Sequence, residues 1–167
     1  MRRVVIISGV VLALDQATKW AVVWGLNLAE RGEIDVFDPF LRFRMAWNRG
    51  VNFGLFSNHA DAVRWVLIAI ALAISFWVFV WLRRENAGYW AQVSGGLLIG
   101  GAIGNVIDRI LYGAVADFLN MSCCGFENPY AFNVADITIF LGAIGLVVFT
   151  DGKPSARRPG TRPRDGG

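Results

Sequence analysis

The sequence contains two long stretches without a single charged residue. Residues 65–82 form an uncharged run of eighteen residues, and residues 86–107 form one of twenty-two. About 20 apolar residues in an α-helix cross the hydrocarbon core of a bilayer, which is roughly 30 Å thick. The chain as a whole is 55% hydrophobic and only 17% charged, which is more apolar than a soluble domain of this length needs. The two runs therefore predict membrane-spanning helices.

Two further apolar stretches, 4–24 and 130–150, lie near the ends of the chain and carry few polar residues. The first runs into DQATKWAVVW and lacks the small-residue cleavage site that ends a secretory signal peptide, so we expect it to stay as a helix. The sequence thus predicts a mainly α-helical membrane protein. We expect one four-transmembrane-helix domain over 1–150, with helices at about 4–24, 65–82, 88–111 and 131–150.

Basic residues gather at three places that an even number of crossings puts on the same side. Nine of the sixteen lie there: Arg2, Arg3, Arg83, Arg84, Lys153, Arg157, Arg158, Arg162 and Arg164. Because basic segments stay in the cytoplasm, we expect both termini inside. Residues 151–167, rich in Gly, Pro and Arg, predict a disordered basic cytoplasmic tail. The net charge of +3 is therefore no sign of nucleic-acid binding.

In the segment between the first two expected helices, apolar residues follow a different spacing from that of a helix. In LRFRMAW, apolar side chains at 41, 43, 45 and 47 alternate with residues 42, 44 and 46. A two-residue repeat is typical of a half-buried β-strand. We expect a small β-sheet on the outer surface of the membrane between helices one and two, within a β-rich segment at about 28–58.

The third expected helix carries glycines and polar residues at regular spacing. Gly96, Gly100 and Gly104 follow one another every fourth position, which lets helices approach closely in lipid. A polar stripe, spaced i, i+4, i+7 and i+8, lies towards the outer end: Gly101, Asn105, Asp108 and Arg109. Asn133 and Asp136 lie one turn apart at the start of the fourth helix. Ionisable residues in membrane segments are costly and indicate a functional site.

Asp15 and Lys19 stand at i and i+4 on the first helix, with the acid first, which suits an ion pair. Such a pair either fixes helix packing or belongs to a site, and the sequence leaves both interpretations open. One histidine, His59, and two adjacent cysteines, Cys123 and Cys124, are too few for a tetrahedral zinc site. We expect no metal and no cofactor.

Asp117 and Asp136 both fall near the outer ends of the last two expected helices. Two carboxylates that share a site hold one proton between them, so one activates water while the other donates. That chemistry predicts an aspartic endopeptidase. Intramembrane Asp, Asn and Lys side chains also suit a proton or ion pathway in a small transporter. The residues by themselves leave these two functions open.

Five short motifs follow one another along nearly the whole chain. They are DQATK at 15–19, NRGVNFG at 48–54, GGAIGNVIDR at 100–109, VADF at 115–118 and FNVAD at 132–136. In this order they resemble the bacterial lipoprotein signal peptidases, also called signal peptidase II. The resemblance implies an enzyme of the bacterial inner membrane, active at the periplasmic side. Its substrates would be diacylglyceryl-modified prolipoproteins, cut N-terminal to the lipidated Cys.

The resemblance also implies roles for single residues. The catalytic pair falls on Asp117 and Asp136, and the supporting positions are Asp15, Asn48, Gly101, Gly104, Asn105, Arg109 and Asn133. We add Lys19 and Asp108 to the supporting residues. The expected partners are lipid-modified prolipoproteins and membrane phospholipid, with no nucleic acid and a monomeric chain. The sequence departs from the family pattern at Val51-Asn52, where small residues are expected, and at Ile137, where a serine is common.

Overall fold

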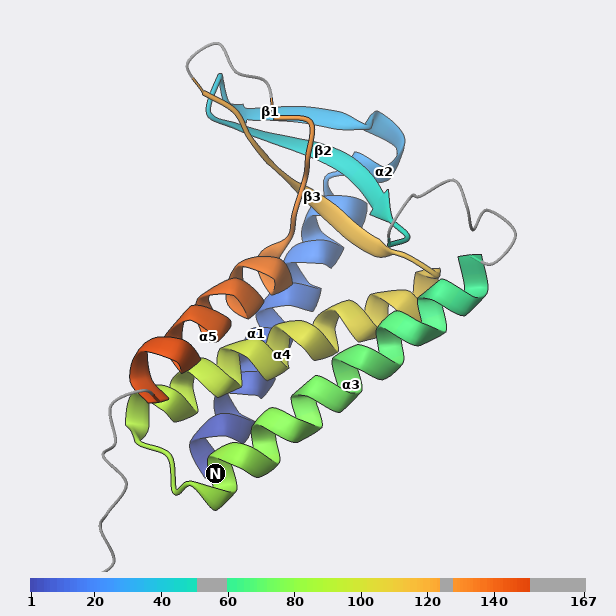
Figure 1. The fold of residues 1–167 in the computed structure, drawn as a ribbon. Helices are drawn as coiled ribbons and strands as arrows, with labels where there is room; N and C mark the ends of the chain where they lie inside the picture. The colour runs from blue at the N-terminus through green and yellow to red at the C-terminus, as the bar shows by residue number, and fades with distance from the viewer. Residues whose placement is uncertain (51–59, 124–127, 151–167) are drawn as a thin grey trace, which may run out of the picture.

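The computed structural model describes residues 1–50, 60–123 and 128–150. Within them, long helices lie side by side and a small three-stranded sheet stands over one end of them (Figure 1). The expectations for 51–58 of the β-rich segment, for Val51-Asn52, His59 and Cys124, and for the tail at 151–167 lie outside the described residues.

The elements follow one another with short connections. They are α1 (Arg2–Lys19), its π-helical continuation η1 (Trp20–Gly25), α2 (Leu28–Arg31), β1 (Glu33–Phe37), β2 (Leu41–Asn48), α3 (Ala60–Arg84), α4 (Tyr89–Tyr112), β3 (Val115–Met121) and α5 (Val134–Thr150). Within the described part of the chain, three helical segments are long and apolar enough to cross a membrane: Arg2–Gly25, Asp61–Arg84 and Tyr89–Tyr112. The last helix, α5, is apolar but has 17 residues.

The helix α4 packs against α1, α3 and α5 (Figure 1). Its glycines make this possible, because a Cβ at Gly96 would lie 2.7 Å from the Cβ of Ile7 on α1. A Cβ at Gly100 would lie 2.7 Å from the carbonyl oxygen of Ser8. The close approach predicted from the four-residue spacing of these glycines is confirmed.

The outward faces of α3 and α5 are apolar. The exposed large side chains include Trp65, Val66, Phe76 and Trp77 on α3, and Phe140, Leu141, Val147 and Val148 on α5. Continuous apolar surface of this kind marks contact with a membrane or a partner, and it agrees with the length and composition of the helices.

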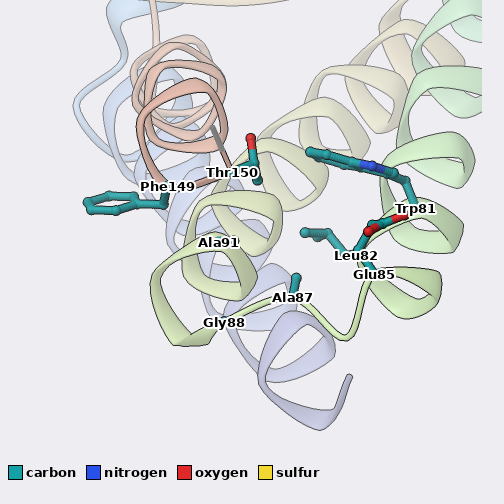
Figure 2. Close-up of a pocket in the computed structure, with 8 residues that line it drawn as sticks. All are labelled: Trp81, Leu82, Glu85, Ala87, Gly88, Ala91, Phe149 and Thr150. Carbon is teal, nitrogen blue, oxygen red and sulfur yellow. The ribbon is translucent and has the colours of Figure 1, made fainter. Parts of the chain in front are cut away.

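A cavity of about 150 Å³ lies at the end of the helices away from the sheet. Figure 2 shows its lining, drawn from the end of α3, the start of α4 and the end of α5. The lining residues are Trp81, Leu82, Glu85, Ala87, Gly88, Ala91, Phe149 and Thr150. None of them is a site residue predicted from the sequence, so this cavity is separate from the residues that the sequence singled out.

The sheet has the order β1-β2-β3, and both pairs are antiparallel. The predicted strand at 41–47 is observed as β2, where a bulge falls between Phe43 and Ala46. The third strand, β3, comes from the segment after α4, so placing the sheet wholly between the first two helices was incomplete. Residues 115–118 of β3 are all buried, and a strand buried on both faces lacks the alternation that reveals a half-buried one.

The sheet covers an apolar core that lies over the end of α1. Its buried members are Val22, Val23, Leu28, Ala116 and Phe118, and Phe43 meets Phe118 edge to face with ring centroids 5.8 Å apart. The β3 strand is thus held from two sides, by β2 and by this core.

Gly100→Ala is expected to destabilise the protein by about 1–3 kcal/mol, because the added methyl group must displace the backbone of Ser8 on α1. Gly9→Ala is the matched control, since nothing lies within 4 Å of a Cβ at Gly9. Thermal unfolding of both variants in detergent would check this. Equal midpoints would contradict the close-packing account.

Candidate active site

Asp117 lies on β3, paired opposite Ala46 of β2, and is only 3% exposed. Two asparagine amides donate hydrogen bonds to its carboxylate. The Nδ2 atom of Asn48, at the end of β2, lies 3.1 Å from Oδ2, and the Nδ2 atom of Asn133 lies 2.6 Å from Oδ1. The Asn48 side chain is itself held, because its Oδ1 accepts from the backbone N–H of Gly50 at 3.0 Å.

Asp136 lies in the first turn of α5 and is half-buried. It forms a reciprocal cap with Asn133: the Asp136 N–H donates to Asn133 Oδ1 at 2.9 Å, and the Asn133 N–H donates to Asp136 Oδ2 at 3.2 Å. This is the arrangement of a capping box. It explains why the helix begins at Val134, three residues after the expected start at 131. The second carboxylate oxygen, Oδ1, accepts from Asn105 Nδ2 at 2.9 Å.

The side chain of Asn133 joins the two aspartates. It is fully buried, and its Nδ2 donates to Asp117 while its Oδ1 accepts from the backbone of Asp136. The strand residue Asp117 and the helix residue Asp136 therefore meet across a single amide group. This arrangement brings together the two acids that the sequence singled out.

The environment of Asp117 favours its protonated form. Burial, and after it the negative charge of Asp136, raise the pKa of Asp117 to about 7, although the hydrogen bonds from Asn48 and Asn133 favour the ionised carboxylate. A desolvated carboxyl beside a second carboxylate keeps its proton at a higher pH than either would alone. The pair is suited to hold one proton near neutral pH, as a general acid with a general base.

Arg109 lies one turn beyond Asn105 on α4, and its Nη1 donates to the Asn105 carbonyl oxygen at 3.2 Å. Its Nε atom is buried and has no hydrogen-bond partner among the described residues. Asn105 and Arg109 line one end of a cavity of about 400 Å³. Its other lining residues are Leu67, Ile70, Ala71, Ile74, Leu98, Ala102 and Ile139. The cavity is apolar along α3, α4 and α5, and Asn105 and Arg109 form its polar end.

The predicted ion pair between Asp15 and Lys19 is observed, with Nζ 2.9 Å from Asp15 Oδ2. The ammonium also lies 2.7 Å from Asp108 Oδ2 and 3.2 Å from Asn105 Oδ1. Asp108 therefore belongs to a buried cluster with α1, which its place on the polar stripe alone did not predict. Gln16 was not singled out from the sequence, although it stands inside the DQATK motif. Its Nε2 donates to Asp15 at 3.1 Å and to Asp108 at 3.0 Å.

Two glycines let the backbones approach around the site. A Cβ at Gly101 would collide with the carbonyl oxygen of Ala135 and the hydroxyl of Thr138 on α5, and one at Gly104 would collide with the carboxylate of Asp15. Since Asn105 lies next to Gly104, this close packing brings its short side chain within reach of Asp136. The sequence-predicted residues are thus gathered in one place, while their roles in catalysis remain a prediction. Over the described ranges, no three His, Cys, Asp or Glu side chains form a metal-binding group.

The chain matches a family model described as signal peptidase II, Peptidase_A8, over residues 7–150. It is 42% identical to the lipoprotein signal peptidase of Methylorubrum extorquens, a match covering 90% of this chain and 85% of that one. It is 37% identical to the lipoprotein signal peptidase of Rhodopseudomonas palustris, a match covering 94% and 98%.

A solved structure described as a bacterial membrane enzyme is similar to this fold with a TM-score of 0.75 and 26% identity, covering 92% of this chain and 96% of the other. A second, with the same description, gives a TM-score of 0.71 over 96% and 94%. The apolar helices agree with these neighbours, so the protein is a membrane protein. Since the family model spans nearly all of its described residues, the chain belongs to the signal peptidase II family.

Proposed function

We propose that the protein is an aspartic endopeptidase that removes signal peptides from diacylglyceryl-modified prolipoproteins, cutting N-terminal to the lipidated cysteine. One observation supports the aspartic mechanism. The buried side-chain amide of Asn133 donates to the carboxylate of Asp117 and accepts from the backbone N–H of Asp136. Membership of the signal peptidase II family supports the protease and the lipoprotein substrate. It does not favour the ion or proton pathway that the residues alone left open.

The two acids differ in environment, and this difference divides the roles. Asp136 is half-buried and acts as the base, while Asp117 is almost fully buried and holds the proton. Asp136 takes a proton from water as the water oxygen attacks the scissile carbonyl carbon, and Asp117 donates its proton to the carbonyl oxygen.

Breakdown of the tetrahedral intermediate completes the reaction. The C–N bond breaks, and the nitrogen of the lipidated cysteine takes the proton held by Asp136. One hydroxyl of the intermediate returns a proton to Asp117, so both acids regain their starting states. The products are a carboxylic acid on the signal peptide and a free amino group on the cysteine.

The apolar cavity beside Asn105 and Arg109 supports a lipidated substrate. Its walls, on α3, α4 and α5, suit hydrocarbon, and we expect the Arg109 guanidinium at its polar end to donate to a substrate carbonyl. Acyl chains held there fix the scissile bond near the carboxylates, and such positioning lowers the entropic cost of reaching the transition state.

The arrangement in the membrane is also a proposal. We place the protein in the bacterial inner membrane as a single four-helix domain over 1–150, with α5 as the fourth crossing and both termini in the cytoplasm. The sheet, whose strand β3 carries Asp117, and the start of α5, which carries Asp136, lie at one end of the helices (Figure 1). We assign this end to the periplasmic side. The basic residues at Arg2, Arg3, Arg83 and Arg84 lie at the other end. The enzyme works as a monomer on phospholipid-embedded substrates without a cofactor.

Asp117→Asn and Asp136→Asn are each expected to lower the cleavage rate of a diacylglyceryl-modified precursor at least about a hundredfold, because each removes a proton-transfer group. Asp61→Asn is the matched control, since the Asp61 side chain is 93% exposed. Purified variants in detergent, checked for folding, would be assayed with lipidated peptide. Normal rates in both dyad variants would disprove the aspartic mechanism.

Cleavage is expected to decline as the pH rises through about 7. Asp117 is protonated below its pKa of about 7 and loses the catalytic proton above it, so kcat falls on the alkaline side. A pH profile of kcat measured on lipidated peptide checks this. A rate that stays constant from pH 6 to about 9 would refute a shared proton held by Asp117.

Asn48→Ala is expected to move the decline of kcat on the alkaline side of the pH profile, its alkaline limb, to higher pH. The Asn48 amide stabilises the ionised form of Asp117, so its removal raises the pKa of this carboxyl further. Gln92→Ala, which removes an amide bonded to the Ala87 carbonyl oxygen, should leave the profile unchanged. A limb that shifts to lower pH in Asn48→Ala would contradict the assignment.

A further inference from the structure

Each proposed catalytic aspartate directly follows an alanine whose backbone N–H is held by a buried carboxylate. The Ala116 N–H, next to Asp117, donates to Asp108 Oδ2 at 3.2 Å. The Ala135 N–H, next to Asp136, donates to Asp15 Oδ1 at 3.0 Å. Hydrogen bonds to an ionised acceptor are about twice as strong as neutral ones. Both chain segments are therefore fixed one residue away from the acid that would do the chemistry.

The two holding carboxylates meet at one ammonium group. Lys19 Nζ lies 2.9 Å from Asp15 Oδ2 and 2.7 Å from Asp108 Oδ2, and none of the three residues is more than 5% exposed. The contacts form a continuous path from Ala116 through Asp108, Lys19 and Asp15 to Ala135. No contact in the described residues joins Lys19, Asp15 or Asp108 directly to the side chain of either catalytic aspartate by a hydrogen bond.

We propose that Lys19, with Asp15 and Asp108, forms a positioning group that sets the separation and orientation of Asp117 and Asp136. The inference rests on the proposed function and deepens it. The strand β3 carries one aspartate and the helix α5 carries the other. The separation of the two aspartates therefore depends on the contacts that hold β3 and α5 in place relative to each other. The cluster ties them through the backbone N–H groups of Ala116 and Ala135, in addition to the amide of Asn133.

Stability alone is a poor explanation of this cluster. A buried ion pair recovers little more than the desolvation cost of its charges, and apolar replacements of similar volume are often as stable. Specifying one geometry is the better-supported use of such groups. Here the geometry specified is that of two backbone segments leading into a proposed catalytic pair, where a misplacement of about 1 Å can reduce the rate about a hundredfold.

The first test is Lys19→Met, which keeps an unbranched side chain one atom shorter and removes the ammonium that joins the carboxylates. We expect kcat per folded molecule to fall about a hundredfold, while KM stays within about threefold because the apolar cavity on α3, α4 and α5 is untouched. Cleavage of lipidated peptide and thermal unfolding would be measured together. Ser94→Ala, which removes another buried polar group of α4, should change neither constant.

A second pair of variants decides the question if Lys19→Met fails to fold. Asp108→Asn keeps an oxygen that can accept from the Ala116 N–H, whereas Asp108→Ala removes the acceptor. We expect Asp108→Ala to lose kcat about a hundredfold and Asp108→Asn to lose less than about tenfold, with similar KM values.

Three outcomes would overturn the proposal: an unchanged kcat in folded Lys19→Met or Asp108→Ala, a rise in KM with kcat intact, or equal losses in Asp108→Asn and Asp108→Ala. These outcomes are separable from a failure of the proposed function. If Asp117→Asn is inactive while Lys19→Met is fully active, only the positioning role is wrong. If Asp117→Asn is itself active, the aspartic mechanism is wrong.

Discussion

The arrangement of this protein depends on the need to pair charges buried among apolar helices. Asp15 and Asp108 are at most 1% exposed, and an unpaired carboxylate at such a place would be very costly. Lys19 lies between them, Asp15 Oδ1 accepts from a backbone N–H on α5, and Asp108 Oδ2 accepts from one on β3. Satisfying two buried acids therefore brings α1, α4, the third strand and the last helix to one point.

Small residues make this convergence possible. Gly96 and Gly100 let the backbone of α1 approach α4, while Gly101 and Gly104 leave room for Ala135 and for the carboxylate of Asp15. The polar contacts depend on this packing, because the side chains of aspartate and asparagine are short. Without a close approach of the backbones, Asn105 would not span the distance from Lys19 to Asp136. Glycine packing and polar pairing are thus two parts of one constraint.

The N-terminus of α5 shows how a local structural motif and a proposed catalytic group share the same atoms. Asn133 and Asp136 cap the helix reciprocally, which is a role that sequence spacing alone supports. The same two side chains reach beyond the helix, to Asp117 on the sheet and to Asn105 on α4. The cap holds Asp136 in a defined orientation, and the amide of Asn133 then determines where Asp117 meets it. Asp136 is in this way bonded to Asn105, which lines the polar end of the apolar cavity.

The amino-acid sequence by itself determined the long helices, the strand at 41–47, and the spacing of the glycines and polar residues on α4, because these signals are local. Uncharged runs, two-residue alternation and four-residue spacing are all properties of one segment. Only the tertiary structure decided that 115–121 forms the third strand, that Lys19 pairs with Asp108 as well as Asp15, and that Gln16 joins them. It also decided the high pKa of Asp117. The physical reason is that burial on both faces erases the alternation of a strand, and that desolvation and charge pairing depend on segments far apart in the chain.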